Sequence, residues 1–222
     1  MSRRYLSGAL VALLLAATPF GAAQAQETST AATSETKPAA EASTPATPEV
    51  LEMALGQEDA PLEVIEYASF TCPHCQSFHE NVFDEIKKNY VDTGKVRFVY
   101  REVYFDRYGL WAGMVARCAG PERYFGLTDI LYDKQKEWLE GNDPAVIADN
   151  LRRIGRSAGL TDEKLEACLS DGAKAQAMVA TYQENAKKDD INSTPSFVID
   201  GKKYSNMNYA DFSKLLDEKL AD

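Results

Sequence analysis

The feature that most constrains the fold is a long segment with helical hydrophobic spacing that separates two groups of predicted strands. Residues 62–68 and 95–100 are rich in β-branched and aromatic side chains, which is typical of buried strands. Residues 104–191 show helical patterns throughout, and the two-residue turn Asp200-Gly201 then predicts a β-hairpin. A crossover between parallel strands needs only about a dozen residues. The order therefore predicts an α/β core with an inserted all-helical subdomain.

Two cysteines stand at the start of the helix that follows the strand at 62–68. In Cys72-Pro73-His74-Cys75 the proline occupies the position that suits the first helical residue, so Cys72 is the predicted N-cap. Free backbone amides and the helix dipole favour a thiolate at Cys72, and a cationic His74 would add to this effect. The pattern predicts a redox pair in which Cys72 exchanges with a substrate and Cys75 resolves the mixed disulfide.

Other interpretations of this motif stay open at the level of the sequence. His79 lies on the same helical stripe as both cysteines, so the three side chains could bind zinc, but the chain has no obvious fourth ligand. The cysteine pair could also form a purely structural disulfide, although so short a loop gains little chain entropy. His74 could be a solvated loop residue, and His79 is more readily explained by packing than by catalysis. We favour redox catalysis and expect no bound metal.

Residues 1–25 have the three-part pattern of a secretory signal peptide. Arg3 and Arg4 supply a positive start, residues 6–17 are apolar, and Ala23-Gln24-Ala25 matches an A-x-A cleavage site. The apolar stretch is shorter than the roughly 20 residues of a membrane span, which disfavours a membrane anchor. We therefore expect cleavage after about Ala25 and export to the periplasm.

Residues 26–48 contain neither aromatic nor large aliphatic side chains, so we expect a flexible Ser/Thr/Ala/Pro/Glu tether. A short helical oligomerisation segment is the alternative. Residues 49–222 are then the folded domain. The formal net charge of the whole chain is −10, which argues against nucleic acid as a partner. We expect a monomer.

The two remaining cysteines, Cys118 and Cys168, lie on apolar faces of the helical segment. In an oxidising compartment an even number of cysteines implies pairing. We therefore expect a structural disulfide that joins two helices. Unpaired thiols within the core are the alternative.

The chain resembles the DsbA-type thiol:disulfide oxidoreductases over roughly residues 50–222. The resemblance rests on Cys72-Pro73-His74-Cys75 after an aromatic-rich strand, on Thr194-Pro195, and on the terminal hairpin. It implies a thioredoxin-like core, which specifies the α/β class more closely, with the helical insertion at about residues 104–191. The tether and the second cysteine pair are departures from the simplest members of that family.

The resemblance also implies roles for three further residues. Glu66, six residues before Cys72, matches the buried acid that passes protons to or from the inner cysteine. Thr194 and Pro195 match the substrate-binding loop, with a cis bond before the proline. Glu66 could instead be an ordinary polar residue of the core, and Pro195 could be trans in an ordinary turn.

The predicted function is the introduction of disulfide bonds into exported proteins. The substrates would be unfolded exported polypeptides with free thiols, no cofactor is expected, and the resemblance implies a DsbB-type membrane quinone reductase as reoxidant. A disulfide isomerase or reductase of the same fold is the closest alternative. A non-catalytic metal-binding or peptide-binding module is the alternative from a different class.

Overall fold

The computed structural model describes residues 48–141 and 143–221. The predicted signal peptide at residues 1–25 and the tether up to residue 47 lie outside these residues. Within the described ranges, no helix combines the length and the apolar character that crossing a lipid bilayer requires.

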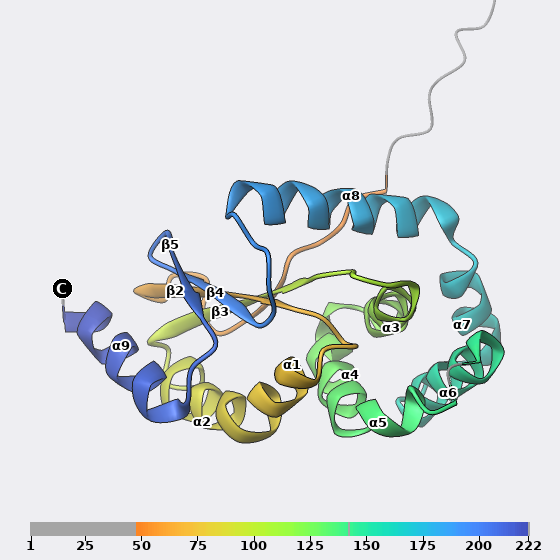
Figure 1. Cartoon of the computed structure of the whole chain (residues 1–222), viewed down its shortest axis with the longest axis horizontal. Helices are drawn as coiled ribbons and strands as arrows, with labels where there is room; N and C mark the ends of the chain where they lie inside the picture. Colours follow the sequence, from red (N-terminus) through yellow and green to blue (C-terminus); the bar gives the residue numbers. More distant parts are fainter. Residues whose placement is uncertain (1–47, 142, 222) are drawn as a thin grey trace, which may run out of the picture. The chain divides into compact units, whose positions relative to one another are not determined.

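A five-stranded mixed sheet forms the centre of the domain (Figure 1). Its order is β1-β3-β2-β4-β5, and only β2 and β3 run parallel. The strands predicted at residues 62–68 and 95–100 are β2 and β3, and the predicted hairpin is formed by β4 and β5. The bounds are β1 Met53–Leu55, β2 Leu62–Ala68, β3 Val96–Glu102, β4 Ser196–Ile199 and β5 Lys202–Ser205.

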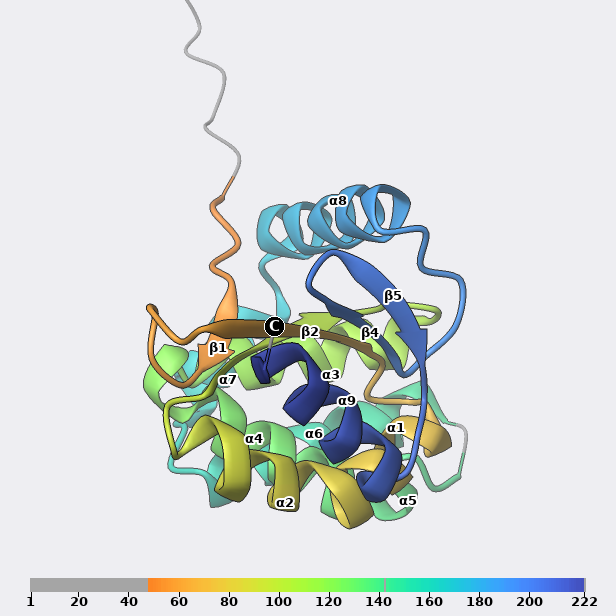
Figure 2. The ribbon, with the colours of Figure 1, turned by 90° about the vertical axis from the view of Figure 1, so that its left-hand side faces the viewer.

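Helices cover both faces of the sheet, as the two views in Figures 1 and 2 show. Helices α1 (Pro73–Phe78), α2 (Asp84–Ile86) and α9 (Tyr209–Ala221) pack on one face, and α8 (Gly172–Lys188) lies across the other. The alternation of side chains along β2 explains this arrangement. Val64 points into the core under α1 and α9, whereas Ile65 and Tyr67 lie in the smaller core under α8.

The predicted helical insertion is present between β3 and β4. All of its helices except Gln135–Trp138 begin at polar caps or prolines, which satisfy or remove the unpaired amides of the first turn. Asp106 caps the first helix of the insertion. Asp143-Pro144 starts a later one, as the sequence predicts. Besides α8, the insertion contains α3 Arg107–Cys118, α4 Pro121–Asp133, α5 Gln135–Trp138, α6 Pro144–Ser157 and α7 Asp162–Leu169.

The helix after the cysteine motif departs from a simple α-helix. The pattern predicts one helix to about Lys88, but the structure contains π-helical turns at His79–Phe83 and Lys87–Val91 on either side of α2. A π-turn shifts the side chains that follow it around the helix axis, so hydrophobic spacing alone does not reveal it. Hydrophobic spacing also predicts one helix over residues 124–139, which the structure divides into α4 and α5.

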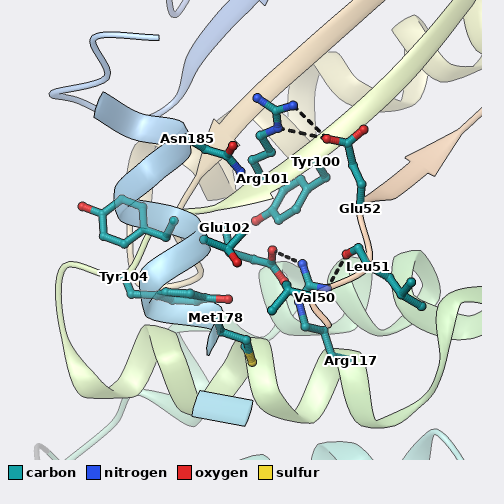
Figure 3. A pocket seen from close by; sticks show the side chains of 12 residues that line it. Val50, Leu51, Glu52, Tyr100, Arg101, Glu102, Tyr104, Arg117, Met178 and Asn185 are labelled. Carbon is teal, nitrogen blue, oxygen red and sulfur yellow. Dashed lines mark hydrogen bonds and ion pairs between the residues drawn. The ribbon is translucent and has the colours of Figure 1, made fainter. Parts of the chain in front are cut away.

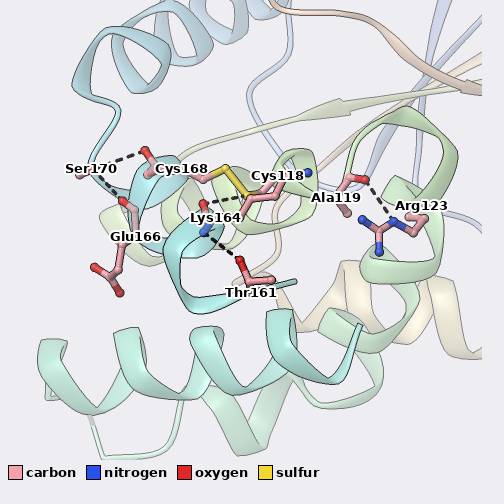
Figure 4. The surroundings of a disulfide bond; sticks show 9 residues. Cys118, Ala119, Arg123, Thr161, Lys164, Glu166, Cys168 and Ser170 are labelled. Carbon is pink, nitrogen blue, oxygen red and sulfur yellow. Dashed lines mark hydrogen bonds between the residues drawn. A yellow bond between two sulfur atoms is a disulfide. The ribbon is translucent and has the colours of Figure 1, made fainter. Parts of the chain in front are cut away.

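Cys118 and Cys168 form a disulfide with their Cα atoms 5.9 Å apart (Figure 4). It joins the end of α3 to α7 across a sequence separation of 50. Thr161 caps α7 by accepting a hydrogen bond from the Lys164 amide at 3.3 Å. The sequence predicts this pairing, and the bridge fastens two helices of the insertion to each other.

Candidate active site

Cys72 and Cys75 lie where the chain leaves β2 and enters α1. Cys72 is the N-cap residue, with extended backbone angles, and Pro73 follows at the first helical position, as predicted. Both thiols are free; Cys72 is partly exposed, whereas Cys75 is buried. The geometry therefore offers one sulfur to a partner and keeps the other inside the protein.

The surroundings of Cys72 stabilise its thiolate and lower its pKa to about 5. The largest cause is a hydrogen bond from the Cys75 thiol, which outweighs the opposing desolvation. The Thr194 side chain and the backbone amides of Cys75 and His74 add smaller contributions. A thiolate at neutral pH is the nucleophilic form and also a good leaving group.

The hydrogen bond between the two thiols lowers the pKa of Cys72 but raises the pKa of Cys75. Burial, the hydrogen bond to Cys72 and the negative charge of Glu66 raise the pKa of the Cys75 thiol far above its ordinary value. The inner sulfur is thus held protonated while the outer one is ionised. Any reaction that makes Cys75 a nucleophile must first remove its proton.

Side chains of the helical insertion hold the loop before α1 in place. The Gln135 amide of α5 donates to the carbonyls of Phe70 and Cys72, at 2.9 and 3.0 Å. The Thr71 hydroxyl donates to Asp106, the cap of α3, at 2.7 Å. Sequence reasoning misses these contacts because they join segments far apart in the chain, and no local pattern marks Gln135.

Glu66 is fully buried on β2 and forms a pair with His79. Its Oε2 lies 3.1 Å from Nε2 of the His79 ring, and both side chains are almost entirely removed from solvent. Glu66 is also close enough to Cys75 for its charge to raise the pKa of that thiol. The predicted nearness of Glu66 to the inner cysteine is therefore present. The partnership with His79 is not predicted by the sequence.

The loop before β4 lies against the outer cysteine. The Thr194–Pro195 bond is cis, and Pro195 is buried. The Cys72 thiol lies 3.5 Å from the Thr194 carbonyl oxygen, to which it donates when protonated. The structure thus brings Thr194 together with the cysteines, as the resemblance implies.

His74 is exposed, and its contribution to the low pKa of Cys72 comes from its backbone amide.

The zinc alternative requires His79 as a third ligand beside the two cysteines. In the structure, Nε2 of His79 instead lies 3.1 Å from Oε2 of Glu66. In the part of the chain that the structure describes, no group of three or more His, Cys, Asp or Glu side chains is arranged to hold a metal ion.

A second polar cluster surrounds a cavity of about 80 Å³ beside the N-terminal segment (Figure 3). There Arg117 donates two hydrogen bonds to buried Glu102, at 2.7 and 2.6 Å, and one to the Leu51 carbonyl at 2.7 Å. Neither Cys72 nor Cys75 lines this cavity. The cluster therefore fastens the N-terminal segment to α3 and takes no direct part in thiol chemistry.

Comparisons with known proteins agree on one family. A family model described as thioredoxin matches residues 48–218. A "Putative protein-disulfide oxidoreductase" of Rickettsia bellii is 33% identical over 172 residues, which cover 77% of this chain and 65% of the relative. The chain thus spans just under two thirds of that relative's length. "Disulfide bond formation protein D" of Bacillus subtilis is 25% identical over 169 residues, or 72% of each protein.

Among solved structures, alpha-DsbA1 of Wolbachia pipientis superposes with a TM-score of 0.71 and 30% identity. The match covers 79% of this chain and 94% of the Wolbachia chain, so it includes the core and the helical insertion. With the reduced cysteine pair at the start of α1, these findings identify the family. The chain belongs to the DsbA-like family of thioredoxin-fold protein-disulfide oxidoreductases.

Proposed function

We propose that this protein oxidises pairs of cysteine thiols in exported polypeptides to disulfides. The observation that carries the proposal is the contrast between the two thiols of α1. Cys72 is partly exposed and its pKa is lowered to about 5, whereas Cys75 is buried and its pKa is raised. A stabilised Cys72 thiolate favours the dithiol form, so the Cys72–Cys75 disulfide is a strong oxidant.

The reaction takes two exchanges. A substrate thiolate attacks Sγ of Cys72, the bond between Cys72 and Cys75 breaks, and the Cys75 sulfur keeps the electron pair and accepts a proton. A second substrate thiolate then attacks the substrate sulfur of the mixed disulfide and releases Cys72 as a thiolate. The substrate loses two electrons and the enzyme gains them.

Thr194 supports this reaction as a substrate-binding residue. Its position beside Cys72 suits an extended polypeptide that pairs with the backbone of this loop. Main-chain pairing does not depend on side chains, which fits a wide range of substrates. Pro195 lacks an amide hydrogen, so it brings no unpaired donor near the sulfurs.

The predicted signal peptide supports a periplasmic location, where new disulfides form and persist. Each turnover leaves the enzyme as the dithiol, so a second partner must accept two electrons. Family membership supports a DsbB-type membrane quinone reductase in that role.

The test is oxidation of a reduced, unfolded model substrate by the purified oxidised protein. We expect one substrate disulfide per enzyme molecule, and no activity in Cys72→Ser or Cys75→Ser, because neither variant can form the Cys72–Cys75 disulfide that oxidises the substrate. Equal activity of the wild-type protein and Cys72→Ser would refute the proposal. A second assay uses a substrate with wrongly paired disulfides. Reduction or reshuffling of those disulfides, with no oxidation of the reduced substrate, would favour a reductase or isomerase instead.

A further inference from the structure

The pair formed by Glu66 and His79 is more than a satisfied contact in the core. Apart from the 3.1 Å contact between Nε2 and Oε2, each side chain keeps one buried polar atom without a hydrogen-bond partner. These atoms are Oε1 of Glu66 and Nδ1 of His79. Burying unpartnered polar atoms costs free energy, so their presence in a native core calls for a reason beyond packing.

The ring of His79 is held in one orientation by aromatic neighbours. It stacks on Tyr132, with ring centroids 4.3 Å apart and planes at 24°, and lies 4.7 Å from the ring of Phe83. The hydroxyls of Tyr132 and Tyr100 bond to each other at 2.6 Å, and Tyr132 also donates to the Ser69 carbonyl at 3.3 Å. Packing alone would be met by a phenylalanine at position 79. An imidazole adds the ability to carry a proton.

The pair interacts electrostatically both with the inner sulfur and with a residue at the surface. Four other titratable groups face or influence the pair: Tyr100 from β3, Tyr132 and Asp129 from α4, and Cys75 from α1. Glu66 acts on Cys75, whereas His79 acts on Asp129, an exposed residue. His79 also opens the π-helical turn at His79–Phe83, a distortion often found at functional sites.

We propose that His79 is a positioning residue that acts through Glu66. It supplies the protons that Glu66 passes to Cys75, and it accepts the protons that Glu66 takes from Cys75. This inference rests on the proposed function. When a substrate thiolate breaks the Cys72–Cys75 bond, the Cys75 sulfur takes a proton from Glu66. Glu66 then takes one from Nε2 of His79. Because Nδ1 is buried, the ring regains its proton there from water only when the surrounding core opens transiently. During reoxidation every proton moves in the opposite direction, and Cys75 becomes the nucleophile.

The test measures the two steps of reoxidation separately across pH, with a small disulfide such as oxidised glutathione as the oxidant. His79→Phe keeps the stacked ring but cannot carry a proton. His79→Gln keeps a hydrogen-bond donor toward Glu66 but does not titrate. In both variants we expect resolution of the mixed disulfide by Cys75 to slow about tenfold or more. Its dependence on pH should also change.

Two quantities should stay unchanged in these variants: the rate at which Cys72 first forms the mixed disulfide, and the pH at which the Cys72 thiolate appears by ultraviolet absorbance. Glu80→Gln is the matched control, because Glu80 is the next residue of the same turn and is exposed. It should behave as the wild type does.

A wild-type rate and pH profile of resolution in His79→Gln would overturn the inference, even if His79→Phe fails to fold. Slowing of both steps by the same factor would also overturn it, since that result indicates a general structural defect. An inactive wild-type protein would instead refute the proposed function.

Discussion

The stability of the reduced protein should depend on pH through the Cys72 thiolate. An ordinary cysteine has a pKa of about 8.5, and the folded protein lowers the pKa of Cys72 to about 5. Between these two values the unfolded chain binds the proton more tightly, so the free energy of unfolding rises with pH. The stabilisation is complete above about pH 8.5 and is lost as the pH falls through about 5.

The size of the effect follows from the same values. At about 1.4 kcal/mol per pKa unit, the full shift corresponds to about 5 kcal/mol. Cys72 is only partly buried, however, and solvent screens part of this interaction. We therefore expect about 2–3 kcal/mol across the window.

The assay is urea unfolding of the reduced protein and of Cys72→Ala at several pH values between about 4 and 9. Groups other than Cys72 contribute to both proteins, so the difference between their free energies of unfolding isolates the thiol. That difference should rise by about 2–3 kcal/mol from pH 5 to pH 8.5. A difference that stays constant over this range would refute the argument.

Three further predictions concern single features of the fold and the site. Replacing Cys118 and Cys168 together by alanine should lower the free energy of unfolding by about 4 kcal/mol, because the bridge closes a loop with a sequence separation of 50. Urea unfolding measures this loss, and a loss below about 1 kcal/mol would contradict the chain-entropy argument. Glu66→Gln should slow the resolution of mixed disulfides by Cys75 more than their formation, and acid quenching with alkylation would separate the two steps; equal slowing of both would leave the carboxylate a structural role. Pro195→Ala should accumulate mixed disulfides with substrates on non-reducing gels, and parental turnover without such complexes would be inconsistent with the role of this loop.

The sequence predicts the main elements of the fold because their signals are local. The strands at residues 62–68 and 95–100 are rich in β-branched and aromatic side chains, and Asp200-Gly201 marks the hairpin turn by its residue types alone. Polar caps such as Asp143 and Thr161 mark where helices begin. The π-helical turns after α1 leave no such local mark, so the predicted single helix is wrong there.

The sequence likewise predicts some features of the candidate site and not others. Cys72 and Cys75 are recognisable because their chemistry depends on a short spacing at a helix start. The cause of the low pKa of Cys72 is less accessible: sequence reasoning emphasises the helix end and His74, whereas the largest contribution comes from the Cys75 thiol. The pairing of Glu66 with His79 depends on how a strand packs against a helix, and one sequence does not determine that register.

The most direct test of the proposed function is the redox equilibrium of the Cys72–Cys75 pair with glutathione. At about 1 mM each of reduced and oxidised glutathione, a pair with a stabilised Cys72 thiolate should remain mostly in the dithiol form. Alkylation of the two thiols after acid quenching, followed by mass measurement, gives the fraction directly. A pair that stays mostly oxidised even in a glutathione buffer as reducing as thioredoxin, about −270 mV, would be a reducing couple. That result would contradict the proposal that this protein introduces disulfides into its substrates.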